Sequence, residues 1–108
     1  MISILNLRIY KPKLPWDFKV DRTTILGNPY NMKDESERDK VCEQYEDWFY
    51  YAAHNQDFHN YLKTLAEAYK QHGKLNLFCW CAPKRCHAKT IKEAIENNDE
   101  ILSRTVIR

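Results

Sequence analysis

The sequence predicts a single α/β domain over residues 1–108, built on a mainly parallel β-sheet. Apolar segments near residues 2–10 and 75–82 are typical of strands, and amphipathic helical patterns lie between them and after the second. Strands separated by helices pair in parallel and carry helices on their faces, which predicts a three-layer fold. The 108 residues are 44% apolar and 30% charged, enough for one modest hydrophobic core.

The first predicted strand, residues 2–10, is almost continuously apolar, as expected of a strand covered on both faces. Prolines up to Pro15 end it, because proline cannot donate to a sheet ladder. Residues 16–22 alternate between apolar and polar, which favours a short second strand. The pattern does not decide the secondary structure of residues 11–24 and 99–108.

Two amphipathic helices are predicted between the strands. Asp34 is a capping residue with Glu37 three positions on, a typical helix start. Asn55 or Asp57 caps the second helix, and Gly73 is placed to end it. The stripe predicted to face the core in the first helix is Val41, Tyr45, Trp48, Phe49 and Ala52. The corresponding stripe in the second is Phe58, Tyr61, Leu62, Leu65, Ala68 and Tyr69.

Gly27-Asn28-Pro29 predicts a sharp turn in which Gly27 takes a positive φ and Asn28 is extended before the proline. One interpretation is a plain surface turn. The other is a loop whose backbone amides, with the Asn28 side chain, line a ligand pocket.

Residues 75–87 form the segment around which the chain is organised, since they hold three of the four cysteines. The strand should stop near Cys81, before Pro83. Strand alternation places Cys79 and Cys81 on one face and Trp80 on the other, and both Cys79 and Trp80 are predicted to pack in the core.

A final helix is predicted to begin at Cys86 and His87. The positive end of its dipole, next to Lys84 and Arg85, would favour a bound anion and a thiolate over a thiol. Ligands bind at the carboxyl ends of parallel strands. We therefore expect the loop that contains Arg22 and residues 27–29 to meet the loop at residues 83–87.

Three interpretations of the Cys/His cluster follow, and the first is favoured. It is a pocket for a phosphate-bearing or nucleotide-like small molecule, with arginine and lysine on the phosphate and Asn28 and Tyr30 on the base. The residues predicted to line it are Arg22, Gly27, Asn28, Pro29, Tyr30, Cys81, Pro83, Lys84, Arg85, Cys86 and His87.

The second interpretation is an enzyme with Cys86 or Cys81 as nucleophile and His87 as base. Neighbouring residues on a helix do not face each other, so Cys86 would need a partner such as His54 or His59. The third is structural zinc, with Cys79, Cys81, Cys86 and His87 as the four ligands, although their spacing is not that of a standard zinc finger. An interaction module that exposes aromatic residues is a further alternative.

Composition limits the classes of binding partner that we expect for this protein. A net charge of +2 is too weak to indicate a nucleic-acid partner, so we do not expect one, and no segment has the roughly 20 apolar residues of a membrane span. The N-terminus lacks a signal peptide, so we expect a cytoplasmic protein with reduced cysteines. The sequence identifies no cofactor, and a twofold homodimer is the commonest assembly of such small domains.

Several motifs together resemble one known family. They are Leu26-Gly27-Asn28-Pro29-Tyr30, Arg38, Tyr45, Trp48, Gly73-Lys74, residues 79–83 and Cys86-His87-Ala88. Over roughly residues 8–97 the chain resembles the domain of unknown function 4326, found in bacteria and phages. The resemblance implies a small Rossmann-like α/β domain and supplies no established reaction. If the chain is encoded by a phage, analogy suggests that it sequesters or degrades a nucleotide signal in the host cytoplasm.

Overall fold

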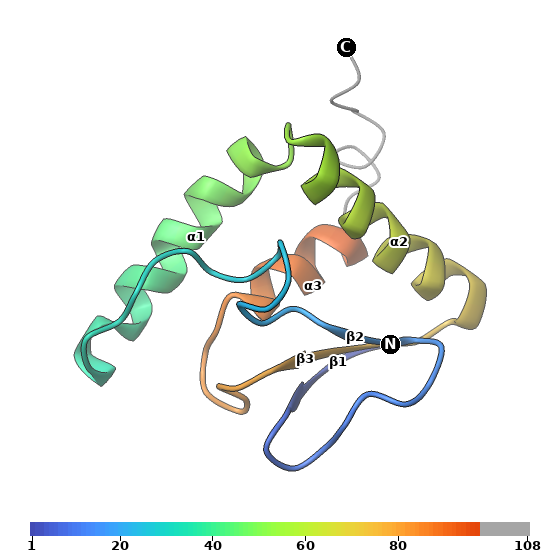
Figure 1. Cartoon of the computed structure of the whole chain (residues 1–108), viewed down its shortest axis with the longest axis horizontal. Helices are drawn as coiled ribbons and strands as arrows, with labels where there is room; N and C mark the ends of the chain where they lie inside the picture. Colours follow the sequence, from blue (N-terminus) through green and yellow to red (C-terminus); the bar gives the residue numbers. More distant parts are fainter. Residues whose placement is uncertain (98–108) are drawn as a thin grey trace.

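Strand β3 (Leu75–Cys79) is the centre of a three-stranded parallel sheet in the computed structural model, which describes residues 1–97 (Figure 1). It pairs on one side with β1 (Ile2–Asn6) and on the other with β2 (Asp17–Lys19). The predicted α/β class with parallel pairing is therefore confirmed. The carboxyl ends of all three strands lie at the same edge of the sheet.

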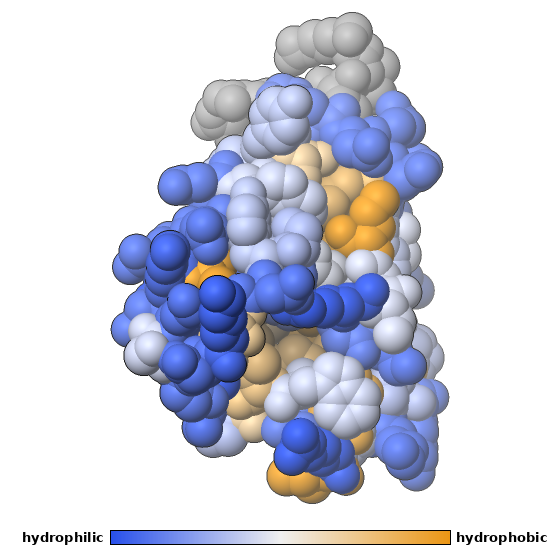
Figure 2. Space-filling model, turned by 60° about the vertical axis from the view of Figure 1, so that its left-hand side comes forward, coloured by the Kyte–Doolittle hydropathy of each residue, from blue (hydrophilic) through white to orange (hydrophobic). Residues whose placement is uncertain are grey.

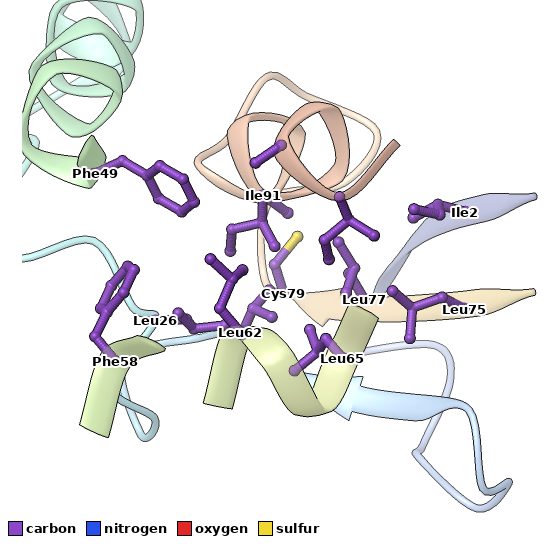
Figure 3. Close-up of a cluster of buried hydrophobic side chains, with 14 of the residues drawn as sticks. Ile2, Leu26, Phe49, Phe58, Leu62, Leu65, Leu75, Leu77, Cys79 and Ile91 are labelled. Carbon is purple, nitrogen blue, oxygen red and sulfur yellow. The ribbon is translucent and has the colours of Figure 1, made fainter. Parts of the chain in front are cut away.

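Helices α2 (Gln56–His72) and α3 (Ala88–Asn97) pack on the same face of this sheet. The register places Ile4, Leu77 and Phe18 side by side, so their side chains point to that face. Figure 3 shows the resulting core. Its labelled members include Leu62, Leu65, Leu75, Leu77, Cys79 and Ile91.

The opposite face of the sheet is covered by the loop at residues 7–16, which lies beside Phe78. Within residues 1–97 the helices thus cover one face, and the three-layer expectation is corrected to two layers. The physical reason lies in the connection from β1 to β2. It contains two prolines and no helical apolar pattern, so it crosses the sheet as a loop.

Each predicted strand is shorter in the structure than in the prediction. β1 ends at Asn6, because the backbone N–H groups of Ile9 and Tyr10 turn back to the Asn6 carbonyl at 3.0 and 2.9 Å. β3 ends at Cys79, as predicted a core residue. Trp80 lies beyond the strand and is 53% exposed, so its predicted place in the core is wrong.

The predicted helix signals are confirmed at three positions. Asp34 caps a short 3₁₀ helix, η1 (Glu35–Glu37), which leads into α1 (Arg38–Ala52). Asn55 caps α2 by accepting hydrogen bonds from two backbone amides of its first turn. Gly73 ends α2 with φ +73°, the left-handed conformation that glycine adopts without strain.

The last predicted segment, a strand or docked tail at residues 101–108, lies outside the described residues. Among residues 1–97 no helix is both long and apolar enough to cross a membrane.

Candidate functional site

A pocket of about 430 Å³ opens at the carboxyl edge of the sheet. The β2–η1 loop (residues 20–34) contributes Asp21, Arg22, Thr23, Asn28, Tyr30 and Met32. Helix α1 contributes Arg38, Val41 and Cys42. The β3–α3 loop (residues 80–87) contributes Trp80, Cys81, Arg85, Cys86 and His87. The predicted meeting of the two loops is confirmed.

Figure 2 shows the side of the molecule that carries α1 in Figure 1. Hydrophilic residues there border a recess with more hydrophobic atoms at its base. The walls of the pocket are accordingly mostly apolar, with arginine side chains among the lining residues. Such a combination is typical of small-molecule sites, in which a few polar groups orient a largely apolar ligand.

Four of the predicted ligand residues do not line this pocket: Gly27, Pro29, Pro83 and Lys84. Gly27 has a structural role, although its predicted positive φ is wrong. A Cβ at Gly27 would lie 2.5 Å from Arg22 Cα and 2.6 Å from Asp21 O. Glycine is therefore required at position 27, because the backbone there lies against the backbone of Asp21 and Arg22 and leaves no room for a side chain.

Asn28 lines the pocket and also ties the β2–η1 loop to α1. Its amide Nδ2 donates to the Val41 carbonyl at 3.3 Å, and its Oδ1 accepts from the Tyr30 amide at 2.8 Å. Nearby, the Tyr45 hydroxyl donates to the Leu26 carbonyl at 2.8 Å. The Asn28 amide is thus occupied by backbone groups, and its main effect is to fix the shape of the wall.

Trp80 and Asp21 join the two loops at the pocket. The indole Nε1 donates to Asp21 Oδ2 at 2.9 Å, while Asp21 Oδ1 accepts from the hydroxyl and backbone amide of Thr23. Burial of Asp21 acts to raise its pKa, but the hydrogen bonds from Thr23 and Trp80 outweigh it and hold the pKa below the ordinary value. Asp21 is therefore an ionised anchor for the indole.

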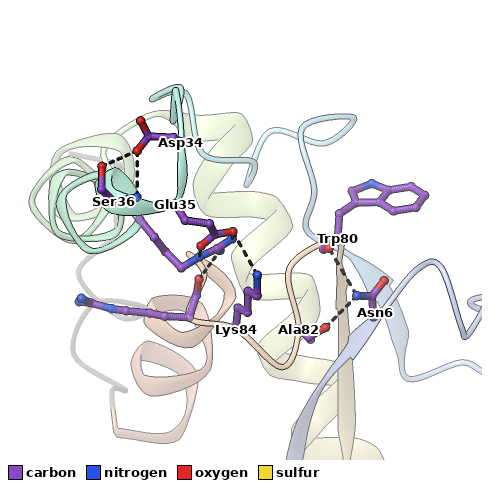
Figure 4. A network of polar contacts seen from close by, with 9 residues as sticks. Asn6, Asp34, Glu35, Ser36, Trp80, Ala82 and Lys84 are labelled. Carbon is purple, nitrogen blue, oxygen red and sulfur yellow. Dashed lines mark hydrogen bonds and ion pairs between the residues drawn. The ribbon is translucent and has the colours of Figure 1, made fainter.

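The β3–α3 loop is also anchored to the end of β1. The Asn6 amide donates to the Ala82 carbonyl at 2.7 Å and to the Trp80 carbonyl at 3.4 Å (Figure 4). The peptide bond between Ala82 and Pro83 is cis. Because Trp80 and Ala82 are both bonded to Asn6, the start of the β3–α3 loop is fixed to the sheet.

Lys84 and Arg85, predicted to take an anion, are paired with carboxylates of η1 and α1. Lys84 Nζ lies 3.2 Å from Glu35 (Figure 4). Arg85 lies 2.9 Å from Asp39 and 3.0 Å from Glu46. An anion at either side chain would have to compete with these carboxylates.

Arg22 is placed differently. Its guanidinium donates to the Tyr30 carbonyl at 2.9 Å and to the Asn31 side-chain oxygen, both neutral acceptors. Among residues 1–97 it forms no ion pair with a carboxylate. Of the arginines that line the pocket, Arg22 is therefore the one whose charge is not offset by a carboxylate, and it is the best placed to bind an anionic ligand.

Arg38 lines the pocket from the start of α1 and is partly buried, with its side chain 15% exposed. It donates to the Arg85 carbonyl at 2.8 Å and to both carboxylate oxygens of Glu35 at 2.6 and 2.7 Å. Hydrogen bonds to Glu35 and then to the Cys81 sulfur raise its pKa, so it is a permanent cation beside Cys81. The bond from Arg38, followed by that from Lys84, lowers the pKa of Glu35 to about 2.

Cys81 is the cysteine that the site ionises. A hydrogen bond with Cys86 and the guanidinium of Arg38 lower its pKa to about 5, against the opposing effect of burial. Cys86 is only 6% exposed; its hydrogen bonds to Cys79 and Cys81, together with burial, raise its pKa. The expectation of a thiolate at the helix start, at Cys86, is therefore wrong, and Cys81 takes that role.

His87 lines the pocket with a buried ring. One ring nitrogen is hydrogen-bonded to the Val20 carbonyl, and the ring packs edge-on against Tyr45 at 5.0 Å between centroids. Burial lowers its pKa, so the imidazole is neutral. The alternative bases, His54 and His59, do not line the pocket.

The residues predicted to bind zinc do not converge. Across residues 1–97, no group of three or more histidine, cysteine or acidic side chains is arranged to hold a metal ion. The imidazole of His87 is turned toward Val20, and Cys79 and Cys86 lie in the core. The spacing of the cluster in sequence was a poor guide to the direction of its side chains.

Half of the lining was not foreseen from the sequence: Asp21, Thr23, Met32, Arg38, Val41, Cys42 and Trp80. Two of these had a usable signal. Arg38 lies in the first turn of a helix, where a cation opposes the dipole and calls for a partner. Trp80 directly follows a strand end, where ligands of parallel sheets bind.

Comparison with known proteins gives one family and no individual relative. No curated protein and no solved structure matches the chain significantly. The family model described as "Domain of unknown function (DUF4326)" matches residues 7–97. That match begins directly after β1 and covers β2, β3, helices α1 to α3 and both loops of the pocket, and the chain belongs to this DUF4326 family.

Proposed function

We propose that the pocket binds a small molecule with a flat heterocyclic part and a phosphate or similar anionic group, as in a nucleotide. The observation that carries this proposal is the composition of the pocket. Apolar and aromatic side chains enclose a pocket of about 430 Å³, and one lining arginine, Arg22, donates hydrogen bonds only to neutral acceptors. This volume lies within the usual range of small-molecule sites, about 300–1,000 Å³.

The flat part of the ligand would lie near Trp80 and Tyr30. The Trp80 indole is half exposed, yet its orientation is fixed by Asp21. A pre-oriented aromatic face favours stacking with a heterocycle, since little conformational entropy is lost on binding. Met32 and Val41 supply further apolar surface in the same pocket.

The anionic part would be bound by Arg22. Its present contacts, the Tyr30 carbonyl and the Asn31 side chain, are neutral and can be exchanged for a phosphate. A guanidinium binds phosphate through two parallel hydrogen bonds. Lys84 and Arg85 have a smaller part in this proposal, because their charges are already offset by Glu35, Asp39 and Glu46.

The test is calorimetric titration with pairs of compounds that differ only in the phosphate: a nucleoside and its 5′-monophosphate, for each common base. We expect at least one monophosphate to bind more tightly than its nucleoside. Arg22→Gln should weaken that monophosphate by about tenfold to a hundredfold, the range for a charge-assisted hydrogen bond, and leave the nucleoside unchanged.

The matched control is Arg8→Gln, since Arg8 is exposed and lies outside the pocket. It should bind like the wild type. Equal weakening by both substitutions would mean that only the net charge matters. Failure of every compound to bind at millimolar concentration would contradict the proposal.

A cysteine-dependent or hydrolytic enzyme acting on such a ligand is the second candidate, favoured by the ionised Cys81 on the pocket wall. In that case Cys81→Ser should keep the affinity for the ligand but abolish its conversion, followed by NMR of the ligand. A simple binding protein would leave the ligand chemically unchanged with either side chain.

A further inference from the structure

The outer edge of strand β1 has backbone groups that point away from the sheet. β1 is an end strand of the order β1-β3-β2 and pairs with β3. The N–H of Leu7 donates to the Cys79 carbonyl, so the odd-numbered residues of this segment bond to β3. The N–H groups of Ile2, Ile4 and Asn6 and the carbonyls of Ile2 and Ile4 therefore face outward. Within residues 1–97 no hydrogen bond uses them.

This edge lacks the features that usually protect an end strand. Proteins block such edges with charged residues, prolines or a covering element, and β1 has the sequence ISILN, without charge or proline. The opposite edge differs, because the Lys19 carbonyl of β2 accepts a hydrogen bond from the Tyr61 hydroxyl at 2.8 Å. β1 is thus the edge that offers a row of donors and acceptors to a further strand.

A groove of about 330 Å³ lies beside this edge, on the face of the sheet that carries the helices. None of the residues among 1–97 that line it is acidic. They include Ile4 of β1, Ala82 and Pro83 of the β3–α3 loop, and three lysines, Lys84, Lys89 and Lys92. The groove therefore has apolar contacts next to the strand and positive charge above it.

Two of these lysines have no carboxylate to offset them. Lys84 lies 3.2 Å from Glu35, but Lys89 and Lys92 form no ion pair among residues 1–97. Both are in the first half of α3, and its first turn has no acidic residue. The positive end of the helix dipole adds to their charge. A negatively charged side chain is therefore favoured in the groove.

We infer that the edge of β1 binds an extended acidic segment of a partner protein, which adds to the sheet as a fourth strand. A partner residue opposite Ile4 has its side chain on the same face as Ile4, and so it points toward Lys89 and Lys92. That residue is an aspartate or glutamate. This interface is separate from the nucleotide proposal, which concerns the other side of the β3–α3 loop.

The positive charge favours such a segment over a second copy of this chain. Antiparallel pairing of two β1 strands in one continuous sheet would place the α3 helices of both copies on the same face. Lys89 and Lys92 would then lie near the same lysines of the partner copy, and like charges repel across an interface.

The first test uses a fluorescein-labelled peptide of alternating glutamate and valine, seven residues long, and measures its fluorescence anisotropy with the full chain. Saturable binding is expected, and the peptide with lysine in place of glutamate should not bind. Only alternate N–H groups of an added strand face β1. Of two peptides N-methylated at every valine or at every internal glutamate, one should therefore bind normally and the other at least about tenfold more weakly.

Variants of the protein test the lysines. The double variant Lys89→Gln with Lys92→Gln should weaken the unmodified peptide about fivefold, as expected for the loss of two partly exposed ion pairs. The matched control is Lys63→Gln with Lys70→Gln, which removes the same charge from exposed positions of α2 outside the groove. It should bind like the wild type.

Amide hydrogen exchange, followed by NMR, tests the edge itself without a substitution. In the chain alone, the amides of Ser3 and Leu5 should exchange slowly because they bond to β3, whereas that of Ile4 should exchange fast. Saturation with the peptide should slow exchange at Ile4 at least about tenfold, since its N–H then bonds to the added strand.

Four results would overturn the inference. Slow exchange at Ile4 in the chain alone would show that another segment or a second copy already occupies the edge. Equal affinities of the two N-methylated peptides would show that no strand is added. Equal weakening by the two double variants would reduce the effect to net charge, and no binding of the peptide at millimolar concentration would exclude the interface.

Discussion

The indole of Trp80 donates a hydrogen bond to the carboxylate of Asp21 across 2.9 Å, joining two residues that are 59 positions apart in the chain. The bond links the residue after β3 to the β2–η1 loop at the edge of the pocket. It also explains how a large aromatic ring can be half exposed and still have a fixed direction. The shape of the site therefore depends on the charge of Asp21.

Protonation or neutralisation of Asp21 should release the indole. The folded pKa of Asp21 lies below its ordinary value, so these hydrogen bonds stabilise the fold fully above about pH 4, the unfolded pKa. That stabilisation is lost as the pH falls through the folded pKa. The indole N–H resonance of Trp80, assigned by its absence in Trp80→Phe, should shift in that acidic range.

In Asp21→Asn the same resonance should lie near the position of an exposed indole and lose its acidic titration. The free energy of unfolding of this variant should also be lower by about 2 kcal/mol, because a hydrogen bond to a charged group is lost. A Trp80 resonance that is identical in the two proteins would contradict this account.

Substitution by alanine should destabilise the fold to different extents at the two glycine positions. Gly27→Ala places a Cβ 2.5 Å from Arg22 Cα, a backbone atom that cannot move aside, and should cost about 3 kcal/mol or more. Gly73→Ala meets no atom within 4 Å and costs only the left-handed backbone conformation, about 1–2 kcal/mol. Urea unfolding of both variants measures the difference, and equal costs would refute the close approach at Gly27.

Local signals in the sequence were reliable where the structure depends on local contacts. The cap at Asn55 and the left-handed Gly73 each depend on a few neighbouring residues, and both are confirmed. The meeting of the two loops was also predictable, because it follows from the rule that parallel strands end at one edge. The direction of individual side chains at that edge was not.

The predictions that were wrong share one physical cause: each of these side chains is placed by a contact with a residue distant in sequence. Trp80 is exposed because Asp21 holds it there, and Arg85 is paired because α1 presents Asp39 and Glu46 to it. Gly27 was correctly predicted to satisfy a backbone need, but that need is the crossing with Arg22 rather than a positive φ. No pattern within a short window contains this information.

Asn28 should tolerate loss of its donor poorly. In Asn28→Asp a carboxylate would face the Val41 carbonyl, which now accepts from the Asn28 amide at 3.3 Å in a buried place. We expect a loss of about 2–3 kcal/mol, the usual penalty for a buried polar group left without a partner. Thermal unfolding of both variants measures the difference. Asn31→Asp, at an exposed site where the side-chain oxygen accepts from Arg22, should leave the free energy of unfolding unchanged.

Alkylation should identify Cys81 as the ionised thiol. Iodoacetamide reacts with thiolates, so its rate at Cys81 should rise with pH around 5, well below the range of an ordinary thiol. Cys86, Arg38 and His87 all act to lower the pKa of Cys81. Arg38→Gln removes the cation and should move the midpoint to higher pH, as read by mass spectrometry of the labelled peptide.

The control for this profile is Cys42, whose pKa is raised by burial and which should react slowly throughout. A Cys81 profile with its midpoint above pH 8 would show that the contacts of Arg38 and Cys86 do not ionise it.

If the two loops at the carboxyl edge form one site for a phosphate-bearing heterocycle, both loops should respond when such a ligand binds. The most direct measurement is a titration of ¹⁵N-labelled protein with nucleoside monophosphates, recorded as amide, indole and arginine side-chain shifts. We expect saturable shifts of the Trp80 indole and the Arg22 guanidinium, together with backbone amides of residues 20–34 and 80–87. Shifts confined to other surfaces, or none at millimolar concentration, would contradict this proposal.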